Sequence, residues 1–401
     1  ARTYRIKVSN LKKASSKVSL WETRSNGKSE EYDTHWLEKT GTLTPVKEGD
    51  SYVYTVTVEP YSMVTLTTTK GQKEYAELKK KTSVDSGKEE EKLALPYSDD
   101  FQYKKEYIQR RGKTPRYTSD VNGAFEAVKL ADGNRVMRQQ LNKDHLPYGW
   151  SGEPTDPVTS LGDDTWKDYI VSADVMLDPE EDAKNYAGIC ARYNAVQSIA
   201  GNGYWLRIYQ NGTWRLYSNQ GKIASGEISG MKPGRFLNLK IKVLNNTVTA
   251  YINNEQVAKK AVKKSPVNSG RVAFGSSFYK NSFDNLKVVP VSGGAIHVTR
   301  TDDLDSSLKF SGSVSRLQSQ SYLYYGRTVS QLKKKSAAVS FTFEGTGISF
   351  LGNNVAGPKI KVSVDGETVE KSYSVQDTEM RAAFYQLTGL EKGKHTIKLE
   401  L

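Results

Sequence analysis

Residues 236–252 read FLNLKIKVLNNTVTAYI, and this stretch indicates how the chain folds. Apolar and polar residues alternate on both sides of Asn245-Asn246, which is the pattern of half-buried β-strands. Asparagine tolerates the positive φ that a tight hairpin needs, so the pair predicts a turn between two strands. The stretch therefore predicts a β-hairpin.

The same alternation recurs far from this hairpin. Residues 51–58 read SYVYTVTV, and Asp365-Gly366 separates the apolar-rich stretches 360–364 and 367–369 as a second predicted turn. The 24 tyrosines of the chain suit half-buried strand surfaces, and long amphipathic helical patterns are missing. We therefore predict an all-β protein.

Length and hydropathy limit the architecture. A chain of 401 residues is too long for one core and predicts two to three domains. The mean hydropathy is -0.62, and no apolar run approaches the ~20 residues needed to span a membrane. Cys190 is the single cysteine, so a disulfide within the chain is excluded, and we interpret it as a small buried hydrophobe.

The charge favours anionic partners. The formal net charge is +13 and the isoelectric point is about 9.3. The lysines, however, are interleaved with acids on β-patterned segments, and no recognition-helix or RNA-binding motif is present. We therefore predict no nucleic-acid binding, and instead a solvated basic surface that attracts anionic polysaccharide or cell wall.

Two boundaries divide the sequence. Residues 71–96 are rich in charge and poor in aromatics, which is typical of a linker, and residues 291–294 (VSGG) predict a short flexible hinge. The predicted domains are a small β-sandwich unit (1–70), a large central β-sandwich (97–291) and a terminal β domain (295–401). The first unit is marginal in size, so we expect it to pack against another part of the protein.

Two aspartate clusters bracket the central segment. Asp99-Asp100-Phe101 opens it, and Phe283-Asp284-Asn285 closes it. Clusters at the two ends of a β-sandwich can meet on neighbouring strands and hold Ca²⁺, which takes carboxylate and carbonyl oxygens. The alternative is that these aspartates cap turns at strand ends. Either way, the pattern indicates binding or structure rather than bond cleavage.

Five stretches carry a family resemblance across residues 1–290. In chain order they are 18–24 (VSLWETR), 54–71 (YTVTVEPYSMVTLTTTKG), 98–101 (SDDF), 137–142 (MRQQLN) and 282–285 (SFDN). Their order and spacing resemble the C-terminal half of the galactocerebrosidase-like enzymes, glycoside hydrolase family 59. The resemblance implies a small β-sandwich followed by a lectin-like, concanavalin A-like β-sandwich.

The resemblance also implies what the chain lacks. In family 59 a (β/α)₈ barrel carries two glutamates, the acid/base and the nucleophile of a retaining mechanism. Nothing in this sequence resembles the barrel, so no catalytic residue is carried over. We expect the chain alone to be non-catalytic, with the unit 1–70 packing on a barrel that belongs to a longer parent protein.

The terminal domain resembles a different group of modules. Residues 339–350, 362–369 and 387–397 are similar to the jelly-roll modules appended to secreted bacterial glycosidases and esterases. This resemblance implies a carbohydrate-binding-like jelly roll at residues 295–401. It also implies a bacterial protein that is secreted or displayed at the cell surface.

The family resemblance assigns the predicted calcium site. It implies that Asp100 and Asp284 are carboxylate ligands and that the backbone carbonyl of Arg135 is a third ligand. Gln102 stands where the animal family has asparagine, and its extra methylene changes its reach. The predicted Ca²⁺ is structural and joins the two ends of the central sandwich.

A predicted substrate-cleft loop contains Tyr148 and Trp150. The family places an aromatic residue here on a loop that overhangs the substrate cleft of the barrel. An indole ring stacks on the apolar C–H face of a sugar, so we expect these residues to contact substrate. The alternative is that Trp150 packs beneath its own loop.

Further sugar-binding candidates come from strand patterns. Trp205 and Arg207 alternate onto one face with Tyr209 beyond them, which suggests a sugar site on a concave face, although strand aromatics more often belong to a core. A second aromatic cluster in the terminal domain has the same two interpretations, sugar stacking or core packing. It consists of Tyr322, Tyr324, Tyr325 and Arg327.

Three functional hypotheses follow. The first is a non-catalytic accessory region of a secreted β-galactosidase of the galactosylceramidase or galactan type. Such a region would brace the barrel, shape the cleft and bind a galactose-containing glycan or glycolipid. The second is a stand-alone carbohydrate-binding or surface adhesion protein, and the third is a structural spacer.

Overall fold

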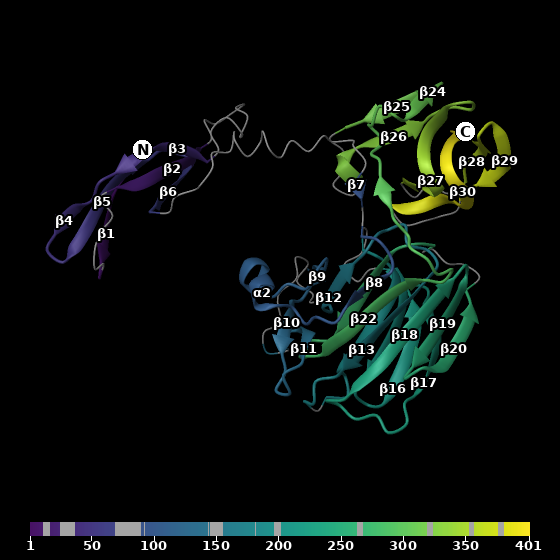
Figure 1. Cartoon of the computed structure of the whole chain (residues 1–401), viewed down its shortest axis with the longest axis horizontal. Helices are drawn as coiled ribbons and strands as arrows, with labels where there is room; N and C mark the ends of the chain where they lie inside the picture. Colours follow the sequence, from purple (N-terminus) through teal and green to yellow (C-terminus); the bar gives the residue numbers. More distant parts are fainter. Residues whose placement is uncertain are drawn as a thin grey trace. The chain divides into compact units, whose positions relative to one another are not determined.

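The structure is a computed structural model of the chain (Figure 1). Almost every regular element is a β-strand, so the all-β prediction is confirmed. The chain divides into two compact units, residues 1–85 and 86–401, and each unit is described by itself. The residues that the structure describes are 1–10, 17–24, 37–68, 90–91, 93–142, 144, 155–180, 182–195, 202–262, 268–318, 324–352, 357–375 and 381–401.

The first unit contains two small antiparallel sheets. Their orders are β1-β5-β4 and β3-β2-β6. Val53, Tyr54 and Val56 of the strand predicted at 51–58 are buried, whereas Tyr4 and Ile6 opposite them are 48% and 40% exposed. The strands are β1 (Arg2–Ser9), β2 (Val18–Arg24), β3 (Glu38–Leu43), β4 (Val46–Glu48), β5 (Ser51–Val58) and β6 (Ser62–Thr67).

The second unit contains two large antiparallel sheets that form a β-sandwich. The first sheet has the order β10-β11-β22-β13-β18-β19-β20, with β8 paired to β22. Its strands are β8 (Tyr97–Asp99), β10 (Phe125–Lys129), β11 (Arg135–Gln139), β13 (Tyr169–Met176), β18 (Phe236–Leu244), β19 (Thr247–Ile252), β20 (Glu255–Ala261) and β22 (Ser282–Pro290).

The second sheet of the sandwich has the order β17-β16-β15-β14-β21-β12-β9. A short helix, α2 (Lys105–Arg111), precedes its edge strand β9 along the chain. Among the helices of the described residues, none combines the length and the apolar character needed to cross a lipid bilayer. The strands are β9 (Ser119–Asn122), β12 (Val158–Leu161), β14 (Tyr186–Asn194), β15 (Asn202–Tyr209), β16 (Thr213–Ser218), β17 (Gly221–Glu227) and β21 (Arg271–Ser276).

The hairpin predicted at residues 236–252 is confirmed. Strands β18 and β19 pair antiparallel, and Leu244 lies opposite Thr247 at the turn. Asn245 has φ +49°, in the left-handed region that asparagine tolerates better than most residues. The turn chemistry of the sequence therefore sets the register of this pair.

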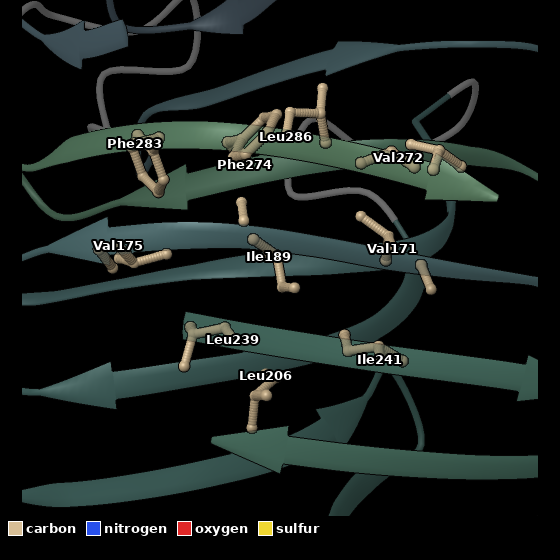
Figure 2. Packing of buried hydrophobic residues seen from close by; sticks show 14 of the residues in the cluster. Val171, Val175, Ile189, Leu206, Leu239, Ile241, Val272, Phe274, Phe283 and Leu286 are labelled. Carbon is tan, nitrogen blue, oxygen red and sulfur yellow. The ribbon is translucent and has the colours of Figure 1, made fainter. Parts of the chain in front are cut away.

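The main core lies between the two sheets. Val171, Ala173 and Val175 of β13 are fully buried, and the residues between them are partly exposed. This alternation places every second side chain of the strand in the core. Figure 2 shows core side chains of both sheets, with β13, β18 and β22 on one side and β14, β15 and β21 on the other. Those labelled are Val171, Val175, Ile189, Leu206, Leu239, Ile241, Val272, Phe274, Phe283 and Leu286.

Strand β14 is buried on both faces. One face contributes Ile189 to the main core, and the other contributes Cys190 to a smaller cluster outside the sandwich. The interpretation of Cys190 as a buried hydrophobe is confirmed, and burial raises the pKa of its thiol. The outer cluster comprises Val158, Cys190, Tyr193, Trp205 and Ala273.

The last part of the chain forms smaller antiparallel sheets with a core of Val362, Ile397 and Leu399. Their orders are β24-β27-β30-β28-β29, β25-β26 and β23-β7. The elements are β7 (Glu90–Glu91), β23 (Thr299–Arg300), β24 (Lys309–Ser311), β25 (Val314–Leu317), the 3₁₀ turn η3 (Tyr325–Arg327), β26 (Val329–Leu332), β27 (Ala338–Gly352), β28 (Lys359–Val364), β29 (Glu367–Ser374) and β30 (Ala382–Glu400).

Ion pairs connect these smaller sheets to the sandwich within the second unit. Asp163 and Asp164, which are 3% and 5% exposed, precede β13. The Nη2 atom of Arg300 lies 3.4 Å from Asp163 and 3.5 Å from Asp164, and Nε of Arg271 lies 2.8 Å from Asp164. Buried carboxylates need such partners, because an unpaired charge away from water is costly.

His395 joins β30 to the turn between β28 and β29. Its Nδ1 lies 2.7 Å from the Asp365 carboxylate, and its Nε2 lies 2.8 Å from the carbonyl of Glu391. Both partners only accept, so both ring nitrogens must carry protons for both bonds to form. The bond with Asp365 and then that with Glu391 raise the pKa of His395. The bonds from His395 and the Thr396 amide lower the pKa of Asp365.

Replacing His395 should therefore destabilise the protein in a pH-dependent way. The stabilisation by the imidazolium is complete below the unfolded pKa of about 6.5 and is lost as the pH rises through the folded value. The Asp365 contribution is present above its unfolded pKa of about 3.9 and is lost as the pH falls. The His395→Gln variant should thus melt at a lower temperature than the parent at about pH 5.5, with a smaller difference at about pH 9.

Calorimetric melting across this pH range measures the effect. The Asp365→Asn variant should also melt at a lower temperature than the parent at about pH 5.5, because it removes the carboxylate partner of the imidazolium. An equal difference in melting temperature between the parent and His395→Gln at both pH values would contradict a stabilising ion pair between His395 and Asp365.

Candidate functional site

The outward face of the second sheet brings together aromatic and cationic side chains. Trp205 lies opposite Cys190 and Tyr217, and Arg207 lies opposite Gly188 and Arg215. Alternation along β15 therefore places Trp205, Arg207 and Tyr209 on one face, as the sequence pattern predicts. We call this surface the Arg207 face, and it comprises Tyr186, Trp205, Arg207, Tyr209, Arg215 and Tyr217.

Arg207 is surrounded by aromatic rings. Its Cζ lies 4.1 Å from the ring centroid of Tyr186, 4.9 Å from that of Tyr217 and 5.3 Å from that of Trp205. The nearest acid is Asp156, whose carboxylate lies 3.9 Å from Nη1 and is half exposed. The side chain of Arg207 is 18% exposed, so the guanidinium still reaches the surface. The aromatic faces attract this cation without neutralising it.

Within the part of the chain that the structure describes, several polar atoms around this guanidinium lack hydrogen-bond partners. They are Nε of Arg207 and the hydroxyls of Tyr186 and Tyr217, all of which are buried. Asp156 lies close enough to influence the Tyr186 hydroxyl, but without the geometry of a normal hydrogen bond. Burial raises the pKa of both tyrosines, so each stays a neutral phenol that can donate a proton. Unsatisfied buried donors are uncommon and call for an explanation.

Two glycines make room for these side chains. A Cβ at Gly275 would lie 2.6 Å from the Trp205 ring, and one at Gly188 would lie 2.2 Å from the carbonyl oxygen of Leu206 and 3.0 Å from Cγ of Arg207. Both side chains therefore lie across the backbone of a neighbouring strand. The Trp205 ring is 2% exposed and packs edge-on against Tyr193 at 5.8 Å, so in this structure its face is covered. Of the predicted pair, Arg207 is the residue that reaches solvent.

A cavity of about 500 Å³ is lined by residues of β16 and β17, among them Arg215, the cross-strand partner of Arg207. Arg215, Ser225 and Glu227 bring cationic, hydroxyl and carboxylate groups to it, whereas the indole of Trp214 is buried in the main core. Register pairs Arg215 with Ser225 and Thr213 with Glu227, so these four side chains share the outward face with Arg207. The lining residues are Asn211, Thr213, Trp214, Arg215, Lys222, Ser225, Gly226 and Glu227.

The two aspartate clusters lie on neighbouring strands. β8 pairs with β22, and Asp99 lies opposite Leu286. Asp99 accepts bonds from the Phe101 amide and from Tyr103, and so holds the start of the sandwich. Asp284 is 5% exposed, and its carboxylate accepts a 2.8 Å bond from the Asn134 side chain.

Two residues of the predicted calcium site, Asp100 and Arg135, direct backbone carbonyls at the side-chain amide of a third, Gln102. The Nε2 atom of Gln102 lies 2.7 Å from the Arg135 carbonyl, 2.6 Å from Oδ1 of Asn134 and 3.2 Å from the Asp100 carbonyl. An amide nitrogen has two protons, so three oxygens around it exceed what it can satisfy. Oxygen-rich surroundings of this kind match the ligand preference of Ca²⁺.

The electrostatics at Asp284 also fit a cation. Burial is the largest cause of its raised pKa, and the charges of Asp174 and Asp100 raise it further. Asp174 lies directly opposite Asp284 on β13. Sequence reasoning missed Asp174 and Asn134, because a mid-strand aspartate and a turn asparagine are individually ordinary. Among the described residues, no group of three or more His, Cys, Asp or Glu side chains is arranged as a metal site. Amide and carbonyl oxygens would therefore have to complete the ligand set.

Other predicted site residues are placed as follows. Tyr148, Trp150 and Tyr322 lie outside the described residues. Tyr325 is 36% exposed and stacks under Arg300, whose Cζ lies 4.8 Å from its ring centroid. This pair belongs to the contact between the terminal sheets and the sandwich. The Tyr324 carbonyl accepts a 3.0 Å bond from Arg381, and Arg327 has φ +60°.

Substitution of Gly275 should disturb the Arg207 face. The Gly275→Ala variant places a methyl group against the Trp205 ring, and overpacking of this kind costs about 1–3 kcal/mol of unfolding free energy. Gly345 on β27 is a matched control, because a Cβ there meets only ordinary van der Waals contacts. Gly345→Ala should change stability by less than about 0.5 kcal/mol in chemical denaturation. Equal effects of the two substitutions would contradict the tight contact between Gly275 and Trp205.

Sequence comparisons identify what the sandwich is similar to. Residues 120–291 match the family model described as galactocerebrosidase, C-terminal lectin domain. The galactocerebrosidase of Danio rerio is 28% identical over 184 residues, which cover 43% of this chain. The chain matches only 27% of the length of that relative.

Comparison with solved structures gives matches to two proteins from Bacillus subtilis. The carbohydrate-binding module CBM66 is 12% identical, with a TM-score of 0.33, and the match covers 43% of this chain and 95% of the module. A protein of unknown function with a galectin-like fold is 10% identical, with a TM-score of 0.35, over 51% of this chain and 98% of that chain. At the level of sequence, the region 120–291 is thus similar to the C-terminal lectin domain of galactocerebrosidase, in agreement with the family-59 resemblance.

Proposed function

We propose that the chain is a carbohydrate-binding accessory region of a β-galactosidase-type glycoside hydrolase, and that its sandwich binds sugar at the Arg207 face. The observation that carries the proposal is the cavity lined by β16 and β17, which includes Arg215, the cross-strand partner of a guanidinium surrounded by aromatic rings. Its volume of about 500 Å³ lies within the range of about 300–1,000 Å³ that is usual for small-ligand pockets.

The chemistry of the cavity suits a sugar. Ser225 and Thr213 offer hydroxyls, Glu227 accepts bonds from sugar hydroxyls, and Arg215 donates to them. The similarity of this region to a lectin domain of galactocerebrosidase suggests galactose-containing glycans or glycolipids as the ligand class.

The proposal for the parent protein is broader. We infer that a catalytic barrel belongs to the same parent, that the first unit braces it, and that the loop with Tyr148 and Trp150 overhangs its cleft. Exposed apolar side chains on the first unit, such as Tyr61 (85%) and Met63 (62%), support a packing role. The proposed setting is a bacterial protein that is secreted or displayed at the cell surface.

A stand-alone carbohydrate-binding or adhesion protein is the alternative. The genomic reading frame around this sequence separates the two proposals. A (β/α)₈ barrel sequence with two strand-end glutamates supports the accessory role, whereas an anchor or a repeat array supports adhesion.

Sugar binding by the intact chain tests the proposed site. We expect binding to glycans that end in galactose on a glycan array. In calorimetric titration, Arg215→Ala and Glu227→Ala should each weaken binding by about three- to tenfold, the loss of one hydrogen bond. Lys240→Ala removes a side chain from the other sheet and should leave the affinity unchanged. Failure of the chain to bind any glycan, or equal binding by all variants, would argue against this site.

We also propose that the sandwich binds one structural Ca²⁺ where its two ends meet. Asp284 and Asp100 would supply carboxylates, and Arg135 and Gln102 would supply a backbone and an amide oxygen. The bound cation would offset the repulsion among Asp100, Asp174 and Asp284. It would thereby hold β8 against β22.

Chelation should therefore destabilise the protein. A ligand at a hundredfold excess over its Kd stabilises the folded state by about 2.7 kcal/mol, so EGTA should lower the melting temperature by several degrees. Asp284→Asn should abolish the difference between calcium and EGTA, because it removes a ligand and a charge. Asp305→Asn removes an exposed turn carboxylate in the terminal sheets and should retain the difference. Identical melting of the parent in calcium and in EGTA would contradict the proposal.

A further inference from the structure

Two arginines lie directly opposite each other on the Arg207 face. Arg207 on β15 pairs with Arg215 on β16, so the two side chains project from the same side of the sheet. Cross-strand partners have Cβ atoms about 4.5–5.5 Å apart, and like charges in this position are destabilising. Lys222, which pairs with Tyr217, adds a third cation. The sheet therefore places like charges on neighbouring strands, where their repulsion is unfavourable.

The acids nearby leave this charge only partly balanced. Asp156 lies 3.9 Å from Nη1 of Arg207, beyond hydrogen-bond distance, and its carboxylate is half exposed. Glu227 lies at the far end of the cavity, opposite Thr213. Among the described residues, the guanidinium of Arg207 donates no hydrogen bond to a protein acceptor. The hydroxyls of its neighbours Tyr186 and Tyr217 likewise have no hydrogen-bond partner among these residues.

The unused groups at this site are mainly donors. A guanidinium only donates, and each neutral phenol has one proton to give. A neutral sugar hydroxyl accepts bonds but also needs an acceptor for its own proton. A carboxylate or sulfate only accepts, and arginine binds such groups with paired, charge-assisted hydrogen bonds. The donor excess therefore matches an anionic ligand group better than a neutral one.

We propose that the Arg207 face binds an anionic sugar residue, with a carboxylate or a sulfate ester held between Arg207 and Arg215. The remainder of the sugar occupies the cavity lined by Thr213, Ser225 and Glu227. This inference rests on the proposed sugar binding and adds the ligand class to it. The net charge of +13 assists the approach of an acidic polysaccharide but does not select the site.

The test compares ligands that differ only in charge. The intact chain is titrated with oligogalactosides, with oligogalacturonides of the same length and with sulfated oligogalactosides. We expect one or both anionic series to bind at least tenfold tighter than the neutral one, with an affinity that falls as salt increases. The two anionic series distinguish a carboxylate from a sulfate ester.

Two variants locate the effect. Arg215→Gln, at an exposed position, and Arg207→Gln should each reduce the anionic preference, which is the ratio of anionic to neutral affinity, to less than about threefold. Arg316→Gln is the control, because Arg316 also stacks on an aromatic ring, at 5.0 Å from the Phe310 centroid, but in the terminal sheets. Melting curves of all variants check that the fold is retained.

Each outcome bears on the proposal. Equal affinity for neutral and anionic sugars would overturn the anionic preference and leave sugar binding intact, whereas binding of neither would refute both. An anionic preference that survives Arg215→Gln in a folded variant would also overturn the inference. Equally tight binding of polyglutamate of the same charge would also overturn the inference, because the net charge of the protein would then explain the binding.

Discussion

The packing of two apolar sheet faces against each other is the interaction on which the second unit depends. Val171, Ile189, Leu206 and Phe274 are fully buried between the sheets (Figure 2). Full burial of such a side chain contributes about 1.5–3 kcal/mol, and the main core contains many of them. Because side chains alternate along a strand, this inward packing also fixes which residues face outward.

The outward face of the second sheet follows from that constraint. Once Leu206 and Ile208 are in the core, Trp205 and Arg207 must project to the other side. Gly188 and Gly275 then allow these long side chains to lie flat over neighbouring strands. The result is a surface with a buried aromatic end near β14 and an exposed charged end near β17.

Electrostatic repulsion recurs at the two places where we propose a ligand. Asp100, Asp174 and Asp284 crowd negative charge where the ends of the sandwich meet, and Arg207 with Arg215 crowds positive charge on the outward face. Packing holds both groups in place, because they lie on strands whose inward residues are buried. A cation at the first place and an anion at the second would each relieve the repulsion. The two proposed sites of the sandwich thus have opposite charge.

The all-β class, the hairpin at 236–252 and the shared face of Trp205 and Arg207 could be predicted from the sequence. These depend on alternation and turn chemistry, which are local properties of the chain. Other features depend on the tertiary structure, because no local sequence pattern contains them. In the folded protein Trp205 is covered, Arg207 lies opposite Arg215, and Asp174 lies opposite Asp284. The physical reason is that strand order and register bring together residues distant in sequence, and the burial of a side chain depends on those neighbours.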